Sequence, residues 1–350
     1  MMKKSLFLEK ANIEKTAKKY VLENANGMRM EFTDFGAIVL SLMIKDKDGI
    51  VRDVVLGFQQ MKDYLRNDMG MGAYIGRNAN RIKDAKVTIE GVEYTLTKIL
   101  GNHNIHSGPK RSHYEFYDAK TGQEESGQYV EFSRRSPHLE QGLPGNLQQN
   151  IRYTLTNQNE FIIDYDMVTD QATIVNPTNH CYFNLDGHDS GVIFDHELEV
   201  YSDKYLEIDE EMIPTGEYVD VKDTPMDFRK RKRIGQDIDS DYLHLQYAHG
   251  YDHTYVFDVD RSLKKVAKLY GAHSGITMTV FSDLCGLQVY SGNYFNGNPG
   301  KQGAVYQRNG GMCLETQFFP NACNEKRFPS PLLRANERFA SRTVYHFEIE

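Results

Sequence analysis

Apolar residues recur at every second position in several stretches of this chain. Residues 38–44 and 161–167 each carry aliphatic or aromatic side chains at alternate positions, next to polar turn residues. The same alternation returns near the end of the chain, over 276–280 and 343–349. A period of two residues predicts β-strands that have one buried face and one exposed face.

Turn residues separate these short runs throughout the sequence. Two dipeptides that end in glycine predict tight hairpins: Asn26-Gly27 between 20–23 and 28–32, and Glu90-Gly91 between 87–89 and 92–96. Helical patterns are few and short, the best being 59–65 and 241–247. Many short strands with frequent turns and 28 glycines predict an all-β fold, either an antiparallel sandwich or a barrel.

Charge and composition narrow the class of partner. The formal net charge of -8 argues against a surface for nucleic acid or an anionic membrane. One basic run, 229–233, departs from the overall negative charge, and such a run most often forms a solvent-exposed face of the protein. No stretch approaches the roughly 20 apolar residues of a membrane helix, and residues 1–10 are too polar for a secretory signal. Four scattered cysteines without a Cys-x-x-Cys pair indicate free thiols, so we expect a cytoplasmic protein.

The candidate chemistry starts from one acid and one imidazole. Glu315 is the lone carboxylate in 311–322, a stretch of otherwise uncharged residues, and His180 lies among amides and aromatic residues in 176–184. Taken alone, each residue also has a purely structural interpretation. Glu315 could be a glutamate at a strand end, and His180 could be a hydrogen-bonded histidine of the core. An unpaired buried charge is costly, however, so such an acid must be hydrogen-bonded, neutralised or functional. Together the two residues supply a base and an acid for proton transfer.

Ordinary pKa values already make this pair usable. At neutral pH a glutamate with a pKa of about 4.3 is ionised, and an imidazole with a pKa of about 6.5 is partly protonated. Two further histidines, His103 and His106, lie three residues apart and could suggest a metal pair. No acidic or cysteine ligands accompany them at metal-site spacing, so no metal is expected.

These segments, in this order, resemble the aldose 1-epimerase family, the galactose mutarotases. The resemblance covers nearly the whole chain and includes 35–37, 53–58, 213–216, 250–253, 290–293 and 330–332. It implies a single domain over residues 1–350, folded as a large antiparallel twisted β-sandwich with a sugar cleft on a concave face. It also implies an isomerase that interconverts the α and β anomers of free hexoses such as galactose and glucose.

Anomer interconversion needs two proton transfers. A base takes the proton of the anomeric hydroxyl while an acid protonates the ring oxygen, and the roles reverse when the opened sugar closes on its other face. The reaction requires no metal, redox cofactor or covalent intermediate. By the resemblance, Glu315 in Leu-Glu-Thr-Gln-x-x-Pro is the base, and His180 in Asn-x-Thr-Asn-His-x-Tyr-Phe-Asn is the acid.

The resemblance also implies the residues that bind the sugar. His106 corresponds to a histidine that hydrogen-bonds the substrate near its reacting end. Arg81, which follows Asn80, corresponds to a sugar-binding arginine, whose planar guanidinium group can donate two hydrogen bonds to adjacent hydroxyls. Asp252 corresponds to the aspartate that accepts hydrogen bonds from the distal hydroxyls, with His253 in support.

Two departures from the family pattern bear on specificity. Loop 109–117 replaces a Gly-Phe-Asp segment and a tryptophan, and this chain has no tryptophan at all. Leu284 stands where relatives often carry glutamine or an aromatic residue. An apolar residue that replaces a hydroxyl-binding one lowers discrimination, so we expect galactose and glucose to be used within about tenfold of each other. Arg77 is expected to be structural.

Three other functions stay open at this point. Asp252 and Glu315 could form the carboxylate pair of a glycoside hydrolase or lyase. The chain could be a non-catalytic carbohydrate-binding protein on the same fold. It could also be an epimerase of hexose 6-phosphates, although it has no glycine-rich phosphate cradle and only the basic run 229–233 favours that function. The preferred aldose is left open, and the protein is expected to be a monomer or a homodimer.

Overall fold

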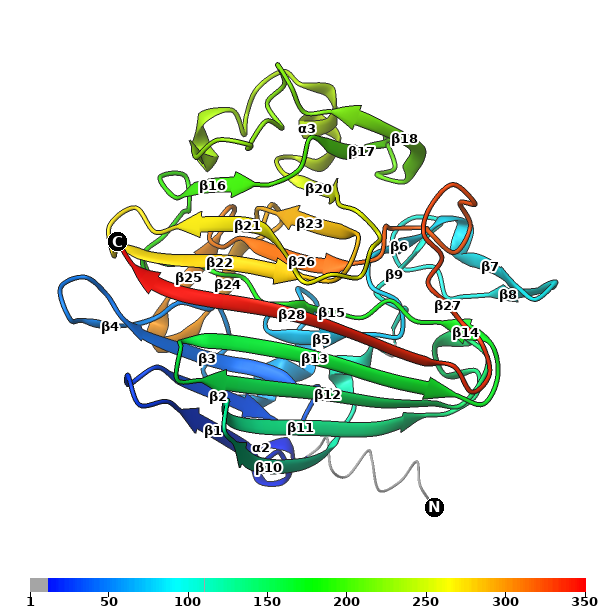
Figure 1. Ribbon diagram of the computed structural model, residues 1–350, viewed down its shortest axis with the longest axis horizontal. Helices are drawn as coiled ribbons and strands as arrows, with labels where there is room; N and C mark the ends of the chain where they lie inside the picture. The colour runs from blue at the N-terminus through cyan, green and yellow to red at the C-terminus, as the bar shows by residue number, and fades with distance from the viewer. Residues whose placement is uncertain (1–11, 110) are drawn as a thin grey trace.

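A computed structural model describes residues 12–109 and 111–350 of the chain. The stretch considered above as a secretory signal lies outside the described residues, as does Lys110 of loop 109–117. Every pair of named strands in the described part is antiparallel, and the helical segments are short (Figure 1). The predicted all-β fold is confirmed, and the strands form sheets that pack face to face as a sandwich.

The largest sheet has nine strands, and its long central strands cross the molecule in Figure 1. In spatial order they are β10 (Asp118–Glu124), β11 (Gly127–Ser136), β12 (Leu147–Thr156), β13 (Glu160–Thr169), β28 (Arg338–Ile349), β22 (Ile276–Ser282), β21 (Lys264–Tyr270), β16 (Glu197–Val200) and β19 (Lys232–Arg233). Strand β13 alternates as predicted, since Phe161, Ile163, Tyr165 and Met167 are buried between partly exposed neighbours.

Two smaller sheets lie on the inner side of this large sheet. One has four strands, β1 (Lys19–Glu23), β2 (Arg29–Thr33), β3 (Ile38–Lys45) and β4 (Val51–Asp53). The other has five, β18 (Pro214–Asp220), β17 (Lys204–Ile208), β20 (Asp252–Val256), β23 (Gly286–Tyr290) and β26 (Cys313–Gln317).

Five two-stranded pairs complete the sheet structure. They are β5 (Ala73–Ile75) with β15 (Thr178–His180), β6 (Arg81–Ile82) with β9 (Asn104–Ile105), β7 (Lys86–Ile89) with β8 (Val92–Thr95), β14 (Thr173–Ile174) with β27 (Leu332–Leu333), and β24 (Asn296–Pro299) with β25 (Val305–Gln307). Both hairpins predicted from glycine-containing turns are confirmed as β1–β2 and β7–β8.

The main hydrophobic core lies between the inner face of the nine-stranded sheet and the two smaller sheets. Phe32 of β2 stacks on Tyr153 of β12 with ring centroids 5.1 Å apart. On the other half of the sandwich, the Tyr345 hydroxyl donates a 2.9 Å hydrogen bond to the carbonyl of Leu314 in β26. The five-stranded sheet is therefore held against the large sheet by apolar packing and by direct hydrogen bonds.

Two details of the predicted strands are wrong. Strand β3 is buried on both faces because a register shift opposite Glu31 and Phe32 changes its alternation, so that Val39 packs into the main core and Leu40 into a second cluster. Ile349, expected on the buried face of β28, is 47% exposed, because it lies at the end of the strand where the sheet no longer covers it.

The helical segments are α2 (Ile13–Thr16), α3 (Leu243–Ala248) and the 3₁₀ turns η1 (Met61–Arg66), η2 (Lys83–Ala85), η3 (Ser112–Tyr114), η4 (Glu140–Gly142), η5 (Ile234–Gln236) and η6 (Lys301–Gly303). The patterns at 59–65 and 241–247 thus correspond to η1 and α3. No helix in the described ranges has the length and apolar character that spanning a bilayer requires.

The basic run 229–233 lies at the edge of the nine-stranded sheet, around β19. Acidic side chains pair with four of its five cations: Arg229 with Asp203 and Asp227, Arg231 with Glu197 and Glu350, Lys232 with Asp237, and Arg233 with Asp195. These pairs neutralise most of the run, as expected of a solvated face.

Candidate active site

Three adjacent strands of the five-stranded sheet arrange polar side chains in two rows. The strand register aligns Asp252 with Tyr290 and Cys313 in one row, and Thr254 with Gln288 and Glu315 in the next. Residues two apart on a strand point to the same face, so both rows lie on one face of the sheet. The opposite face of β26 contacts the nine-stranded sheet, where the hydroxyls of Thr316 and Thr343 are hydrogen-bonded. The two rows therefore face away from the core.

The rows face a cleft of about 290 Å³, whose size suits a small ligand. All six residues predicted from the sequence line this cleft: Asn80, Arg81, His106, His180, Asp252 and Glu315. They come from the sheet, from β15 and from the β6–β9 pair, so five segments distant in sequence meet at one place.

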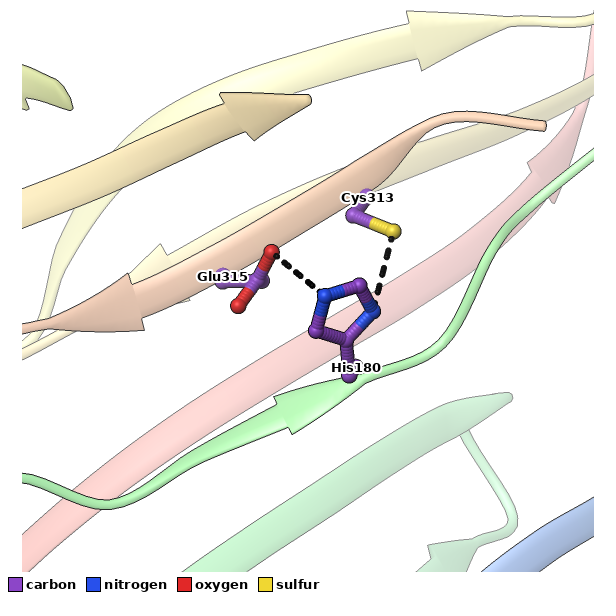
Figure 2. Close-up of side chains that lie close together, drawn as sticks. All are labelled: His180, Cys313 and Glu315. Atoms are coloured by element: carbon purple, nitrogen blue, oxygen red, sulfur yellow. Dashed lines mark hydrogen bonds and ion pairs between the residues drawn. The ribbon is translucent and has the colours of Figure 1, made fainter. Parts of the chain in front are cut away.

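His180 and Glu315 lie side by side (Figure 2). Phe183 and Met312 exchange backbone hydrogen bonds, which fixes the segment after β15 next to the start of β26. The Nε2 atom of His180 is 3.6 Å from the Oε1 atom of Glu315, and both side chains are buried. An imidazole and a carboxylate at this distance can each exchange a proton with one ligand placed between or beside them.

Burial changes the protonation expected from ordinary pKa values. It lowers the pKa of His180 to about 4 and, with Asp252 nearby, raises the pKa of Glu315 well above its usual value. Both shifts favour the uncharged forms, because removing water destabilises the charged ones. Burial thus favours a protonated glutamate beside a neutral histidine in the free protein, where the ordinary pKa values of unperturbed groups give an ionised glutamate beside a partly protonated histidine.

His106 is held in one tautomer by its backbone surroundings. The backbone N–H of Asn80 donates a 3.2 Å hydrogen bond to Nδ1 of His106, and the backbone N–H of His106 donates to the carbonyl of Asn80 at 3.1 Å. Burial keeps the pKa of His106 well below its usual value, so the ring is neutral. Since Nδ1 accepts, Nε2 carries the proton and is a hydrogen-bond donor.

Arg81 and Asp252 form a buried ion pair at the cleft. Nη2 of Arg81 is 3.1 Å from Oδ2 of Asp252, and Nε2 of Gln288 donates to Oδ1 of Asp252 at 2.6 Å. Gln288 in turn accepts a hydrogen bond from Thr254. The backbone N–H of Asp252 donates to Nδ1 of His253 at 3.0 Å, so His253 does support Asp252, through the main chain.

Two polar atoms in the cleft have no hydrogen-bond partner among the described residues. They are Oε2 of Glu315 and Nε of Arg81, and both are buried. Buried polar groups are normally hydrogen-bonded, so an unpaired acceptor and an unpaired donor in one cleft point to a ligand that carries hydroxyl groups.

Arg77 is structural, as predicted. Its side chain is fully buried, and its guanidinium donates to the backbone carbonyls of Ser136, Pro137, Leu143, Pro144 and Gly145 and to the hydroxyls of Ser136 and Thr173. None of these contacts involves the cleft.

The role expected for Leu284 is wrong. Its side chain is 1% exposed and packs in the main hydrophobic core, and it does not line the cleft. Loop 109–117 does reach the cleft, but only through Arg111 among its described residues. His113 of the same loop is fully buried below it.

Two groups of residues in or near the cleft carry side chains that can ligate metals. Nδ1 of His103 accepts a hydrogen bond from the backbone N–H of Asp84, whereas Nδ1 of His106 accepts one from the backbone N–H of Asn80. The two rings are therefore bound to different backbone segments. His180, Cys313 and Glu315 bring ligand atoms within 4.8 Å of one another. Cys313 contacts Nδ1 of the ring, however, while Glu315 lies at Nε2 (Figure 2). The two side chains thus lie at different nitrogens of one ring.

Several cleft residues were not predicted from the sequence. Tyr182, Tyr290 and Tyr294 line its apolar side, and Gln288 orients Asp252. The alternation of β26 places Cys313 on the face of Glu315, a signal already present in the sequence. Gln288 gives no such signal, because its role depends on the register between β20 and β23.

The fold and the cleft define a β-sandwich protein with a buried histidine–glutamate pair in a small-ligand site. The family model described as Aldose 1-epimerase matches residues 18–346. Galactose mutarotase from Sus scrofa is 36% identical over 337 residues, 95% of each chain, and aldose 1-epimerase from Escherichia coli (strain K12) is 35% identical over 336 residues, 94% of each. The chain belongs to the aldose 1-epimerase family, whose members are isomerases.

Solved structures show the same architecture. The crystal structure of an aldose epimerase homologue from C. elegans superposes with a TM-score of 0.87 at 28% identity, covering 95% of this chain and 99% of that one. Galactose 1-epimerase from Lactobacillus acidophilus NCFM gives a TM-score of 0.82 at 26% identity, covering 95% and 98%. The galactose mutarotase type of β-sandwich implied by the sequence is confirmed.

Proposed function

We propose that this protein is an aldose 1-epimerase that interconverts the α and β anomers of free hexoses, with galactose and glucose among its substrates. The observation that carries the proposal is the buried pair, in which Glu315 keeps an unpaired carboxylate oxygen beside the imidazole of His180. The names of the relatives, galactose mutarotase and aldose 1-epimerase, agree with this substrate class.

Glu315 takes the proton of the anomeric hydroxyl, and His180 delivers a proton to the ring oxygen. Ionised glutamate with protonated histidine holds as many protons as protonated glutamate with neutral histidine. The pair can therefore pass from the uncharged form favoured by burial to the reactive form by transfer of one proton over the 3.6 Å between them. No exchange with solvent is required during ring opening and closure.

The remaining cleft residues hold the sugar while the opened aldehyde rotates about its bond to the next carbon. Asp252, fixed by Arg81 and Gln288, accepts from distal hydroxyls, and the unpaired Nε of Arg81 donates to one of them. Nε2–H of His106 donates near the reacting end, since its Nδ1 is occupied by Asn80. These contacts bind ground and transition states alike, so they set affinity more than turnover.

The geometry does not favour glycoside hydrolysis. A hydrolase needs two carboxylates free to act on one bond, whereas both oxygens of Asp252 are engaged by Arg81 and Gln288. A pure sugar-binding protein, for its part, has no need of the proton-exchanging pair formed by His180 and Glu315. Both alternatives make the same prediction, a lack of anomer interconversion.

The proposal is tested by polarimetry on freshly dissolved α-galactose and α-glucose, with and without the protein. We expect the approach to anomeric equilibrium to accelerate for both sugars and to be unchanged by EDTA. Binding without acceleration would identify a carbohydrate-binding protein. Activity lost in EDTA and restored by zinc would contradict the metal-free mechanism.

One observation favours a second candidate, epimerisation of hexose 6-phosphates. Arg111 lines the cleft, and within residues 12–109 and 111–350 its guanidinium has one hydrogen-bond partner, the carbonyl of Asp68 at 2.6 Å. A guanidinium without a carboxylate partner suits a phosphate group. Comparison of glucose 6-phosphate with glucose in wild type and in Arg111→Gln tests this. A phosphate preference that disappears in the variant supports it, and equal use of both sugars by wild type excludes it.

A further inference from the structure

Cys313 contacts the nitrogen of His180 that faces away from Glu315. Its Sγ atom is 3.5 Å from Nδ1 of His180, and the thiol is fully buried (Figure 2). Cys313 and Glu315 are two residues apart on β26, so one strand supplies a partner to each nitrogen of the same ring. The proposed mechanism uses Nε2 and leaves the role of this sulfur unassigned.

The contact can run in either direction, and two observations decide it. Burial raises the pKa of the Cys313 thiol well above its usual value, so the sulfur is a neutral S–H that can donate or accept weakly. On the other side of the ring, Oε1 of Glu315 lies 3.6 Å from Nε2 of His180, and burial raises the pKa of Glu315, which favours a protonated carboxyl that can donate to Nε2. A neutral imidazole whose Nε2 accepts carries its proton on Nδ1. Nδ1 therefore carries a proton, and the sulfur accepts.

We propose that Cys313 is a positioning residue for His180, whose sulfur accepts a hydrogen bond from Nδ1–H and thereby leaves Nε2 as the nitrogen that exchanges the proton with the sugar. The hydrogen bond made by one ring nitrogen fixes the state of the other, and such outer partners also hold the ring in place. The inference rests on the proposed function for its effect on turnover, while the tautomer itself is a property of the sugar-free protein.

A sulfur acceptor differs from the carboxylate that often contacts a catalytic histidine. A carboxylate stabilises the imidazolium strongly, because the hydrogen bond is charge-assisted. A neutral thiol is a weak acceptor, so it orients the ring and yet lets the proton leave easily. This suits a reaction in which the same histidine must give a proton to the ring oxygen and take it back within one turnover.

The other groups around the ring do not replace this contact. The rings of Tyr182, His106 and Tyr290 lie with centroids 4.9, 5.4 and 6.1 Å from that of His180, and they pack against it tilted or edge-on. Of the charged groups, Glu315 lies at Nε2, and Asp252 and Arg111 act on the ring only through their charge.

The test compares Cys313→Ala with Cys313→Ser. Serine keeps an acceptor at the same position, so we expect it to retain kcat within about threefold of wild type. Alanine removes the acceptor and should lower kcat about tenfold with KM within about twofold, because loss of a partner that orients a reacting group typically costs ten- to a hundredfold. Cys285→Ala, in a buried cluster outside the cleft, is the matched control and should leave kcat unchanged.

Nitrogen-15 NMR of the histidine rings in the sugar-free protein gives a readout independent of turnover. We expect His180 to be protonated at Nδ1 in wild type and in Cys313→Ser, and to be a mixture of tautomers in Cys313→Ala. A wild-type ring protonated at Nε2, or a Cys313→Ala variant with wild-type tautomer and kcat, would overturn the proposal. If the tautomer shifts as expected in a protein that does not interconvert anomers, the positioning role stands and the proposed function fails.

Discussion

The nine-stranded and five-stranded sheets use polar residues in opposite ways. In β13 of the large sheet, Phe161, Ile163, Tyr165 and Met167 are buried, and the aspartates between them are partly exposed. In β26 of the small sheet, all five residues are buried, although three of them are Glu315, Thr316 and Gln317. Solubility does not explain polar residues on a strand that is buried throughout. Glu315 lines the cleft, whereas Thr316 is hydrogen-bonded to Thr343 of the large sheet.

The ion pairs of the two sheets differ in the same way. On the outer face of the large sheet, Arg342 and Asp164 pair at 2.6 Å with both side chains partly exposed, an arrangement that contributes little to stability. In the cleft, Arg81 and Asp252 are paired while almost fully buried. A buried pair rarely stabilises a fold relative to apolar residues, because both charges lose their water. The cleft pair is therefore best explained by ligand binding.

The largest effect expected is that of Glu315→Gln. The variant should lower kcat by about 10² to 10⁴, the usual contribution of one general base.

The stability of Glu315→Gln should match that of wild type at acid pH and exceed it at pH 8. The pKa of Glu315 is raised in the folded protein, so its contribution is fully present below its unfolded pKa and is lost as the pH rises through the folded value. Polarimetry and denaturation at both pH values measure the two effects, and a variant with more than half of wild-type kcat would exclude Glu315 as the base.

His180 predicts a pH effect of the opposite sign. Its pKa is about 4 in the folded protein against 6.5 normally, so its contribution to stability is complete above pH 6.5 and is lost as the pH falls towards 4. Between pH 7 and pH 4, wild type should lose up to about 3 kcal/mol more free energy of unfolding than His180→Asn. Urea denaturation across this range checks it. Parallel curves for the two proteins would mean that His180 does not titrate as a buried group.

Asp252→Asn should act on binding. Loss of the charged acceptor weakens hydrogen bonds to the sugar hydroxyls by about 1 to 3 kcal/mol. We expect KM to rise roughly tenfold to a hundredfold while kcat falls much less, as measured by initial rates over a range of galactose concentrations. A selective loss of kcat would instead assign Asp252 to the proton transfer.

The smallest effect is expected on the outer face. Asp164→Asn breaks the pair with Arg342, and it should change the free energy of unfolding by less than about 1 kcal/mol. Because neither Asp164 nor Arg342 lines the cleft, kcat and KM should stay at wild-type values. A change in kcat above threefold would show that the two sheets are coupled through the core.

The sequence predicted the large sheet well because its strands follow a simple period. Phe161 to Met167 alternate in the chain and in the structure. The meeting of Glu315 and His180 in one cleft was also predictable, since both lie in distinctive local sequences, while their acid and base roles stay a prediction. Prediction failed where three-dimensional context decides. Leu284 lies in the bend between β22 and β23, and nothing in the neighbouring sequence indicates that its side chain points into the core.

Protonation states were likewise beyond the sequence. The ordinary pKa values of histidine and glutamate assume water around both groups, whereas the five-stranded sheet and β15 bury them together. Gln288 was not predicted for a related reason. Its contact with Asp252 depends on how β20 and β23 are aligned, and strand register is set by packing of the whole sandwich.

The most direct test of the acid–base pair is a double-mutant cycle on anomer interconversion. Rates for α-galactose are measured by polarimetry for wild type, Glu315→Gln, His180→Asn and the double variant. If the two residues act as one unit, the double variant should lose about as much kcat as the more damaging single variant, because the first change already removes the shared proton transfer. If the losses multiply, the two residues act independently, and the paired mechanism is contradicted.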